Sequence, residues 1–239
     1  VAERWPGAEV RVLADSGARL LITSGGSLSV AAEAAGSVGD CVVVTLDETR
    51  TDQLAAVVIS WATVGSDDAP MPGTLPALPD IDSLLSLQYT SGTTGFPKAC
   101  MLTHRYWLQV GRAAVSHASL SADDVILTAQ PFSYMDPQWN LVAALIAGAT
   151  LVVLPRFSPR TFWNAVRACD VTWCYVVGAM PVFLMSLPGT DDDRNHSLRF
   201  VTCSGIVPDL HAEFERRWGV PWREAYGMTE TGVDRACGF

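Results

Sequence analysis

Short apolar runs, rich in valine, leucine and isoleucine, alternate along this chain with longer amphipathic stretches. The runs are typical of buried strands and lie at 19–23, 41–46, 83–89, 125–129, 150–154, 171–177, 198–203 and 220–226. Helical patterns lie between most of them, at 8–16, 31–35, 104–117, 139–147, 160–168, 179–187 and 208–218. This alternation predicts an α/β fold of mostly parallel sheets covered by helices.

Particular residues mark the ends of several of these elements. Thr103 is a suitable N-cap for the helix at 104–117, and it follows a segment, 100–103, that we expect to be extended. Ser158 is placed to cap the helix at 160–168, with Pro159 at the first helical position. Chain connections of this kind bring the carboxyl ends of the strands to one edge of a sheet, where ligands bind.

The stretch 65–79 is rich in Pro, Asp and Gly and gives the strongest loop signal in the chain. We therefore expect residues 1–79 to form a first α/β unit, incomplete at its N-terminus, with its linker. Residues 80–239 would then form a second unit. Because the chain has no initiator Met and ends without an expected closing element, we expect it to be part of a longer protein.

Composition and charge exclude several classes of protein. About half of the residues are hydrophobic (49%), which excludes general disorder. The net charge of −9 provides no excess of positive charge for binding nucleic acid or an anionic membrane. No segment approaches the roughly 20 apolar residues that span a bilayer. The six cysteines form no CxxC pair and are typical of buried thiols in a reducing cytoplasm.

The strongest chemical signal is a loop rich in glycine and hydroxyl groups that begins where the run 83–89 ends. Glycines let its backbone turn tightly and approach a ligand, while the hydroxyls and a terminal lysine suit polyphosphate oxygens. It is not a Walker loop, because Pro97 precedes the lysine and Ala99 follows it. The alternative is a solvated turn between two strands, but the full string of residues at 89–98 disfavours it. The candidate ligands are Thr90, Ser91, Gly92, Thr93, Thr94, Gly95 and Lys98.

A second motif, Tyr–Gly–Met–Thr–Glu–Thr, occupies residues 226–231. Together with the Tyr–Thr–Ser–Gly–Thr–Thr–Gly–Phe–Pro–Lys string at 89–98, it resembles the signatures of the adenylate-forming (AMP-binding) enzymes. That superfamily includes acyl- and aryl-CoA synthetases, peptide-synthetase adenylation domains and firefly luciferase. The resemblance covers nearly the whole chain. It implies that the chain is part of the large N-terminal domain, with the C-terminal domain and its catalytic lysine absent.

The resemblance implies roles for residues of the second motif. Glu230 would be the magnesium ligand and, with Lys98, a catalytic residue, because Mg²⁺ is commonly held by one carboxylate and phosphate oxygens. Sequence alone equally allows a Glu230 carboxylate at the start of a helix. Thr231 would contact a phosphate, Tyr226 would lie near the adenine, and Gly227 and Thr229 would belong to the same ATP site. A half-buried strand aromatic is the alternative for Tyr226, and both can hold together.

Two further segments are similar to family segments but depart from the usual residues. Ser204–Gly205–Ile206–Val207 resembles the glycine-rich segment along the adenine, with Ile206 and Val207 in place of glycine and alanine, so Gly205 is a candidate ligand. A plain strand-to-helix turn explains it equally well. Segment 130–136 resembles the border of the acyl pocket, where many relatives have histidine and this chain has Tyr134. Core aromatics before a helix are the alternative.

The resemblance implies an acid–thiol ligase. ATP and a small-molecule carboxylic acid would give an acyl-adenylate and pyrophosphate, and coenzyme A would then take the acyl group. The segment 132–163 is more similar to medium-chain or carnitine-type CoA ligases than to peptide-synthetase domains. The alternatives are a nucleotide-binding fragment without turnover, or a peptide-synthetase adenylation domain. We expect this chain alone not to form acyl-CoA. The acid and the oligomeric state are not determined by the sequence.

Overall fold

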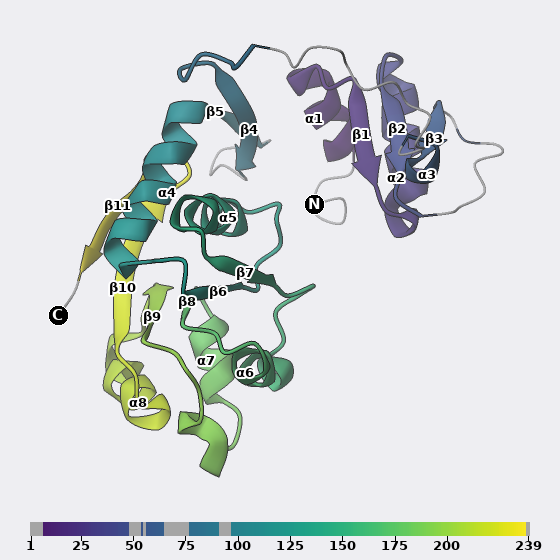
Figure 1. The fold of residues 1–239 in the computed structure, drawn as a ribbon. Helices are drawn as coiled ribbons and strands as arrows, with labels where there is room; N and C mark the ends of the chain where they lie inside the picture. Colours follow the sequence, from purple (N-terminus) through teal and green to yellow (C-terminus); the bar gives the residue numbers. More distant parts are fainter. Residues whose placement is uncertain (1–6, 48–53, 55, 65–76, 91–96, 238–239) are drawn as a thin grey trace. The chain divides into compact units, whose positions relative to one another are not determined.

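The computed structural model describes residues 7–47, 54, 56–64, 77–90 and 97–237 (Figure 1). The chain divides into two compact units, Val1–Leu78 and Pro79–Phe239. The expected α/β fold is confirmed, because both units contain parallel sheets with helices packed against them. None of the helices in the described part is long and apolar enough to cross a membrane.

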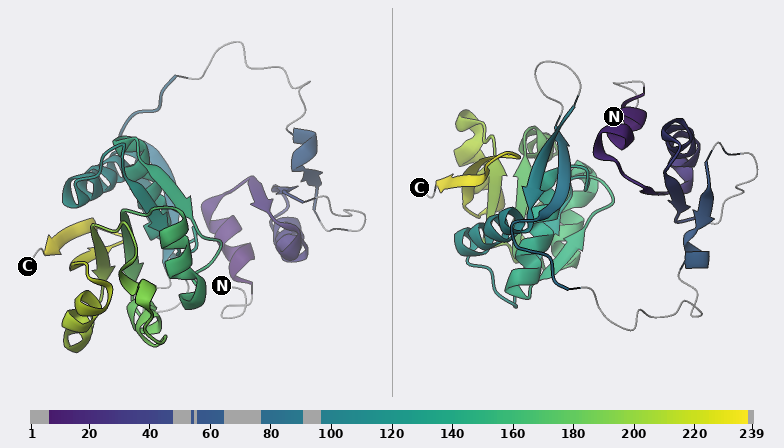
Figure 2. Two further views of the ribbon diagram at one scale, coloured as in Figure 1. Left: turned by 60° about the horizontal axis from the view of Figure 1, so that its bottom comes forward. Right: turned by 90° about the horizontal axis from the view of Figure 1, so that it is seen from above.

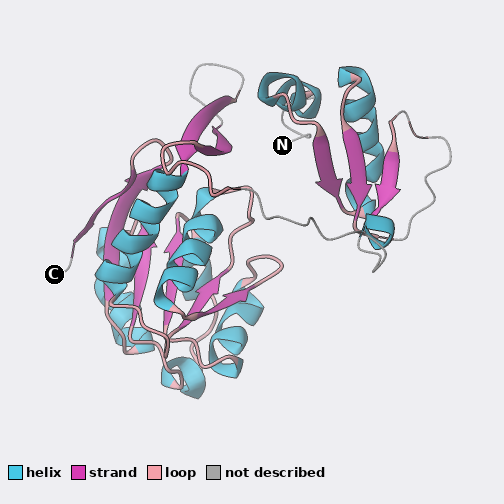
Figure 3. Ribbon diagram, turned by 45° about the horizontal axis from the view of Figure 1, so that its top comes forward, coloured by secondary structure: helices cyan, strands magenta, loops and turns pink. Residues whose placement is uncertain are grey.

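The first unit is a three-stranded parallel sheet in the order β1-β2-β3 with helices packed on it (Figure 3). Helix α2 contributes a row of buried alanines to the core, which also includes Leu13, Leu28 and Val43. The short strand and helix after residue 56 were not predicted. The elements are α1 (Ala8–Ser16), β1 (Leu20–Thr23), a 3-10 turn (Gly25–Ser27), α2 (Leu28–Val38), β2 (Val42–Thr45), β3 (Val58–Ser60) and α3 (Trp61–Val64).

The second unit contains a six-stranded sheet in the order β11-β10-β9-β8-β6-β7. Five of its strands are parallel, and only β11 is antiparallel to its neighbour β10. The strands of this sheet are β6 (Val125–Thr128), β7 (Thr150–Val153), β8 (Trp173–Val177), β9 (Phe200–Ser204), β10 (Trp222–Met228) and β11 (Gly232–Cys237). A separate antiparallel hairpin is formed by β4 (Leu84–Thr90) and β5 (Lys98–Thr103) (Figure 2).

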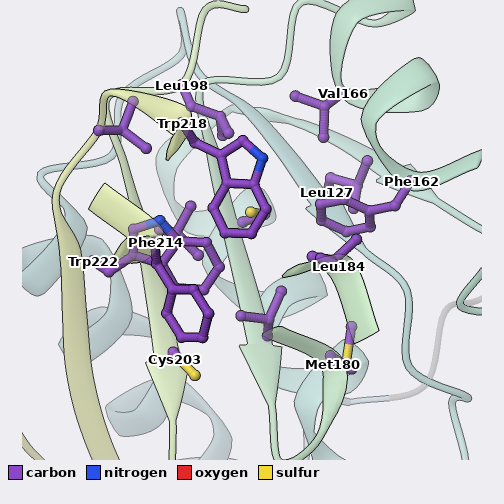
Figure 4. Packing of buried hydrophobic residues seen from close by; sticks show 14 of the residues in the cluster. Leu127, Phe162, Val166, Met180, Leu184, Leu198, Cys203, Phe214, Trp218 and Trp222 are labelled. Carbon is purple, nitrogen blue, oxygen red and sulfur yellow. The ribbon is translucent and has the colours of Figure 1, made fainter. Parts of the chain in front are cut away.

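Helices cover both faces of this sheet. Helices α4 (His104–Ala118) and α5 (Met135–Ala147) pack on one face, and their core contains Trp107, Trp139 and Trp173. Helices α6 (Pro159–Ala168), α7 (Met180–Met185) and α8 (Pro208–Trp218) pack on the other. Figure 4 shows the core of that second face, in which Trp218 is fully buried and lies beside Trp222 and Phe214.

The predicted start signals of the helices are confirmed in part. The Thr103 hydroxyl accepts a hydrogen bond from the Tyr106 backbone N–H at 3.2 Å, which confirms it as the N-cap of α4. Pro159 begins α6 as expected, but the Ser158 side chain makes no capping hydrogen bond, so that part of the prediction is wrong. Helix α5 begins at Met135, earlier than the apolar pattern suggested, because its first turn is polar.

Two predictions about strands need correction. The run 83–89 was expected to be a buried strand, but every residue of β4 is half-buried or exposed. It belongs to a separate two-stranded hairpin and not to the central sheet. No closing element was expected after the second motif, yet the chain returns antiparallel to β10 as strand β11. An edge strand needs no long apolar run, so its sequence carried little signal.

Candidate nucleotide and acyl site

The phosphate-loop candidates Ser91, Gly92, Thr93, Thr94 and Gly95 lie outside the described residues. The other two loop candidates, Thr90 and Lys98, belong to the hairpin. Thr90 ends β4, Lys98 begins β5, and the two are paired directly across the hairpin. Lys98 is exposed. The loop therefore begins and ends at one cross-strand pair, with a hydroxyl on one strand and a cation on the other.

The second motif lies at the far end of β10 and in the turn that leads into β11. Tyr226 and Gly227 belong to the strand, beyond Glu224, the last residue of β10 that is paired with β9. Thr229, Glu230 and Thr231 form the turn. Glu230 is therefore not at the start of a helix, which removes the alternative explanation of its carboxylate.

Helix α4 fixes this turn in place. The Tyr106 hydroxyl donates a hydrogen bond to the Thr229 carbonyl oxygen at 2.8 Å. Gly232 is buried at φ +81° directly after the turn, and a Cβ atom there would lie 2.7 Å from Cγ2 of Val110. This close approach of backbone to helix requires glycine. Because α4 follows directly from β5, one continuous segment supports both motifs.

The thiol of Cys100 shows that the two motifs are adjacent. Burial raises the pKa of Cys100, and the Glu230 carboxylate raises it further through its charge and a hydrogen bond. A hydrogen bond with the Thr90 side chain acts in the opposite direction. Cys100 therefore lies within reach of both Thr90 and Glu230. Since side chains alternate along a strand, Lys98 lies on the same face of the hairpin as Cys100 and thus on the face toward Glu230.

The donor set around Glu230 suits a metal held partly by a ligand. Glu230 is exposed, and no group of three or more His, Cys, Asp or Glu residues that could hold a metal occurs among the described residues. One carboxylate completed by phosphate oxygens and water is a common arrangement for Mg²⁺. Glu230 and the hydroxyls near it fit that arrangement and do not fit a cage made of protein ligands alone.

Gly205 lies in the turn between β9 and α8 at φ +84°, exposed, with no atom within 4 Å of the position that a Cβ would take. A short network holds the strand ends beside it. The Ser204 hydroxyl donates to the Ala225 carbonyl oxygen at 2.6 Å and is 2.5 Å from the Tyr175 hydroxyl. Three neighbouring strands are thus joined at their carboxyl ends, beside the second motif.

A pocket of about 640 Å³, counting the solvent at its mouth, opens next to Tyr226 and Gly227. The pocket lies between the helices α4 and α5 and the strands β8, β9 and β10. Aromatic side chains form much of its wall, and the sequence did not identify them as site residues because a helix and two strands that are far apart in the chain contribute them. They are Trp139, Trp173, Tyr175 and Phe200.

Tyr134 itself is 61% exposed and lies immediately before α5, while the next two residues, Met135 and Asp136, line the pocket. Its role at the acyl pocket stays a prediction. The turn that carries it is held by glutamines. Gln88 of β4 donates to the Ser133 carbonyl oxygen at 2.7 Å, and Gln138 of α5 donates to the Gln88 side chain at 2.9 Å. The hairpin and the pocket rim are therefore directly connected.

Comparison with known proteins agrees with this geometry. A family model described as AMP-binding enzyme matches residues 1–237. The chain belongs to the AMP-binding enzyme family. The signatures at 89–98 and 226–231 thus identified the family correctly.

Relatives and solved structures of the family include CoA ligases. The chain is 36% identical over 163 residues to the crotonobetaine/carnitine–CoA ligase of Salmonella typhi, covering 66% of this chain and 31% of that one. It is 38% identical over 145 residues to the human long-chain fatty acid transport protein 5, covering 59% and 21%. An anthranilate CoA ligase in complex with anthranoyl-AMP has the same fold, with a TM-score of 0.81 at 20% identity, covering 97% and 45%. The chain therefore spans less than a third of these two curated relatives.

Proposed function

We propose that the protein to which this chain belongs activates a carboxylic acid with ATP and transfers the acyl group to coenzyme A. The observation that carries the proposal is that helix α4, which continues directly from the hairpin of the phosphate loop, holds the turn of the second motif through the hydrogen bond from the Tyr106 hydroxyl to the Thr229 carbonyl oxygen. In the proposed site, Thr90, Lys98 and Glu230 contact the phosphates and magnesium of bound ATP, and the pocket that Tyr226 and Gly227 line holds the acid. Membership of the family and similarity to CoA ligases support it.

The chemistry follows from these groups. A carboxylate oxygen of the acid attacks the α-phosphorus, the bond from that phosphorus to the bridging oxygen breaks, and pyrophosphate leaves with the bond electrons. The thiolate of coenzyme A then attacks the acyl carbon, and AMP leaves. Negative charge develops on the phosphates in the first step. Lys98 and the loop hydroxyls are the groups of this chain that offset it. Magnesium, when held by Glu230, would add positive charge at the same oxygens.

Nucleotide binding can be tested at the side-chain amine of Lys98, since Lys98 is the only lysine of the chain. An amine-reactive reagent should therefore modify only Lys98 and the N-terminal amine. We expect ATP with Mg²⁺ to protect Lys98 while the N-terminal amine reacts as before, which mass spectrometry of the peptides resolves. Equal labelling of Lys98 with and without saturating ATP would contradict its place at the phosphates.

Turnover is tested by pyrophosphate exchange into ATP, using the full-length natural protein and a panel of carboxylic acids. We expect exchange that depends on the acid, followed by thioester formation when coenzyme A is added. Exchange without thioester formation would indicate a different acceptor, as in a peptide-synthetase adenylation domain. If ATP protects Lys98 but no acid supports exchange, the proposed ligase activity is wrong and only nucleotide binding stands.

A further inference from the structure

The turn at the rim of the acid pocket, residues 131–134, depends on hydrogen bonds for its shape. All four of its residues are exposed, with Phe132 at 44% and Tyr134 at 61%, so burial of its side chains contributes little to holding it. The Tyr134 backbone N–H donates to the Pro131 carbonyl oxygen at 2.9 Å and closes the turn. Helix α5 begins directly after it with Met135, which lines the pocket. The shape of the turn therefore sets this part of the pocket rim.

Two glutamine side chains bind three consecutive carbonyl oxygens of this turn. Gln138 of α5 donates to the Phe132 and Tyr134 oxygens at 2.9 and 3.1 Å. Gln88 of β4 donates to the Ser133 oxygen at 2.7 Å, and its own side-chain oxygen accepts from Gln138 at 2.9 Å. Gln138 lies in the helix that follows the turn, whereas Gln88 belongs to the hairpin, 45 residues before Ser133 in the chain. Through Gln88 the hairpin thus contacts the turn directly.

Gln88 shares one face of the hairpin with two of the candidate phosphate ligands. Side chains alternate along a strand, so Ser86, Gln88 and Thr90 lie on the same face of β4. Lys98 is paired with Thr90 across the hairpin and lies on that face as well. On this face Ser86 accepts a hydrogen bond from the Trp107 indole N–H at 2.9 Å, which joins the hairpin to helix α4. Gln88 therefore lies between this attachment and the phosphate ligands, about 7 Å along the strand from Thr90.

We propose that Gln88 is a positioning residue that couples nucleotide binding to acid binding. The proposal rests on the function proposed above and adds to it a regulation of the same site. A nucleotide that contacts Thr90 and Lys98 restrains the end of the hairpin, and through the hydrogen bonds of Gln88 it also restrains the turn 131–134. The acid then binds beside a rim that is already ordered.

The coupling follows from the cost of ordering the turn. When the nucleotide has already met this cost, the acid binds more tightly. By reciprocity, the acid raises the affinity for the nucleotide by the same factor. A role of Gln88 in stability alone predicts a different result. Its loss would then destabilise the fold or weaken each ligand by itself, and the factor by which one ligand improves the other would stay the same.

Amide hydrogen exchange tests the first step of this coupling without an acid. The full-length natural protein is measured with and without α,β-methylene-ATP and Mg²⁺, and exchange is followed in peptides that cover 131–138. We expect the nucleotide to slow exchange there by about fivefold or more in the wild type. Gln88→Met keeps the length of the side chain and removes both hydrogen-bonding groups, so the slowing should fall below about twofold. Equal slowing in the wild type and in Gln88→Met would overturn the proposal.

Two further variants place the effect at Gln88. Gln88→Glu keeps an acceptor for Gln138 but replaces the donor to the Ser133 oxygen by a second acceptor, so it should lose the slowing as well. Gln109→Met is the matched control, because Gln109 is exposed on α4 and lies outside the pocket. It should retain the full slowing. Loss of the slowing in Gln109→Met, or full slowing in Gln88→Glu, would overturn the assignment to the Gln88 hydrogen bond.

The second step is measured by calorimetry, using the acid that supports the fastest pyrophosphate exchange. In the wild type, α,β-methylene-ATP should lower the dissociation constant of this acid by about fivefold or more. In Gln88→Met the improvement should be less than about twofold, while each ligand alone binds within about twofold of its wild-type affinity. An unchanged improvement, with both ligands alone binding more weakly, would show a purely structural role and refute the coupling.

The same measurements separate this proposal from the proposed function. Protection of Lys98 by ATP and acid-dependent pyrophosphate exchange, without slower hydrogen exchange at the turn, would leave the ligase activity intact and refute the coupling. Slower hydrogen exchange that depends on Gln88, without pyrophosphate exchange for any acid, would refute the ligase activity and retain the link between nucleotide and turn. The absence of both Lys98 protection and slower hydrogen exchange would refute both proposals.

Discussion

Substitution of Gly232 by alanine tests whether the turn carrying Glu230 depends on its close contact with helix α4. The added Cβ would lie 2.7 Å from Cγ2 of Val110, well inside the roughly 3.5–4.0 Å of ordinary carbon contacts. The backbone at φ +81° adds a second cost, because alanine rarely adopts a left-handed conformation. Both effects act at a buried position directly after the second motif.

The expected loss can be worked from these two terms. A left-handed conformation costs a residue with a side chain about 1–2 kcal/mol. Overpacking of a well-packed contact costs about 1–3 kcal/mol. Their sum, about 2–5 kcal/mol, corresponds to a decrease of roughly 4–20 °C in the melting temperature of a unit of this size. Thermal unfolding followed by circular dichroism measures it.

Matched variants separate the two terms. Gly178→Ala also places alanine at positive φ, but with no atom within 4 Å of the new Cβ, so it should show the backbone cost alone. Val110→Ala removes the methyl group that the new Cβ would meet. The double variant Gly232→Ala/Val110→Ala should therefore be more stable than the sum of the single effects predicts, by about 0.5–3 kcal/mol. Strict additivity, or equal losses in Gly232→Ala and Gly178→Ala, would refute the contact.

Three other variants address the site itself. Lys98→Ala should weaken ATP binding by about 1.5–3 kcal/mol through the loss of a charge-assisted contact, and unchanged affinity in calorimetry would remove Lys98 from the phosphates. Glu230→Gln should abolish the improvement of ATP binding by Mg²⁺, whereas Glu213→Gln on the exposed side of α8 should retain it. Because burial raises the folded-state pKa of Asp136, its ionised form costs stability at neutral pH. Asp136→Asn should thus be more stable than wild type near pH 7 in denaturant titrations, with the difference fading as the pH falls through the raised folded-state pKa and absent below the unfolded value of ~3.9; a difference that is constant with pH would contradict this.

The parallel sheet was predictable because its central strands, β6, β8 and β9, are mostly buried. Runs such as 171–177 and 198–203 are mostly apolar, and two helices of the unit carry clear start signals in Thr103 and Pro159. Strand β11 was missed because an edge strand need not be apolar, and β3 because it is short and passes directly into α3. The half-exposed hairpin strand β4 was identified as a strand but wrongly as a buried one.

For the candidate site, too, the sequence predicted the residues that lie in a continuous motif and missed those that come together only in the folded chain. Residues within one continuous motif, such as Lys98 and Glu230, were proposed from the sequence because their spacing is distinctive. The pocket wall was not, because Asp136, Tyr175 and Arg223 come from three separate elements and meet only after the sheet and helices pack. A carboxylate in the first turn of an otherwise apolar helix was the one available signal, and the helix dipole explains it equally well.

The tryptophans of the second unit give it two independent optical signals. Trp163, Trp218 and Trp222 pack ring to ring on the face opposite the pocket, at centroid separations of 5.0 and 5.2 Å along the series. Rings so close together couple their electronic transitions, so this cluster should produce a strong near-ultraviolet circular dichroism band that disappears when tertiary packing is lost. Trp139 and Trp173 line the pocket instead. A ligand entering it should shift the fluorescence emission of those two indoles while the dichroism of the cluster stays constant, so occupancy and unfolding can be followed separately in one sample.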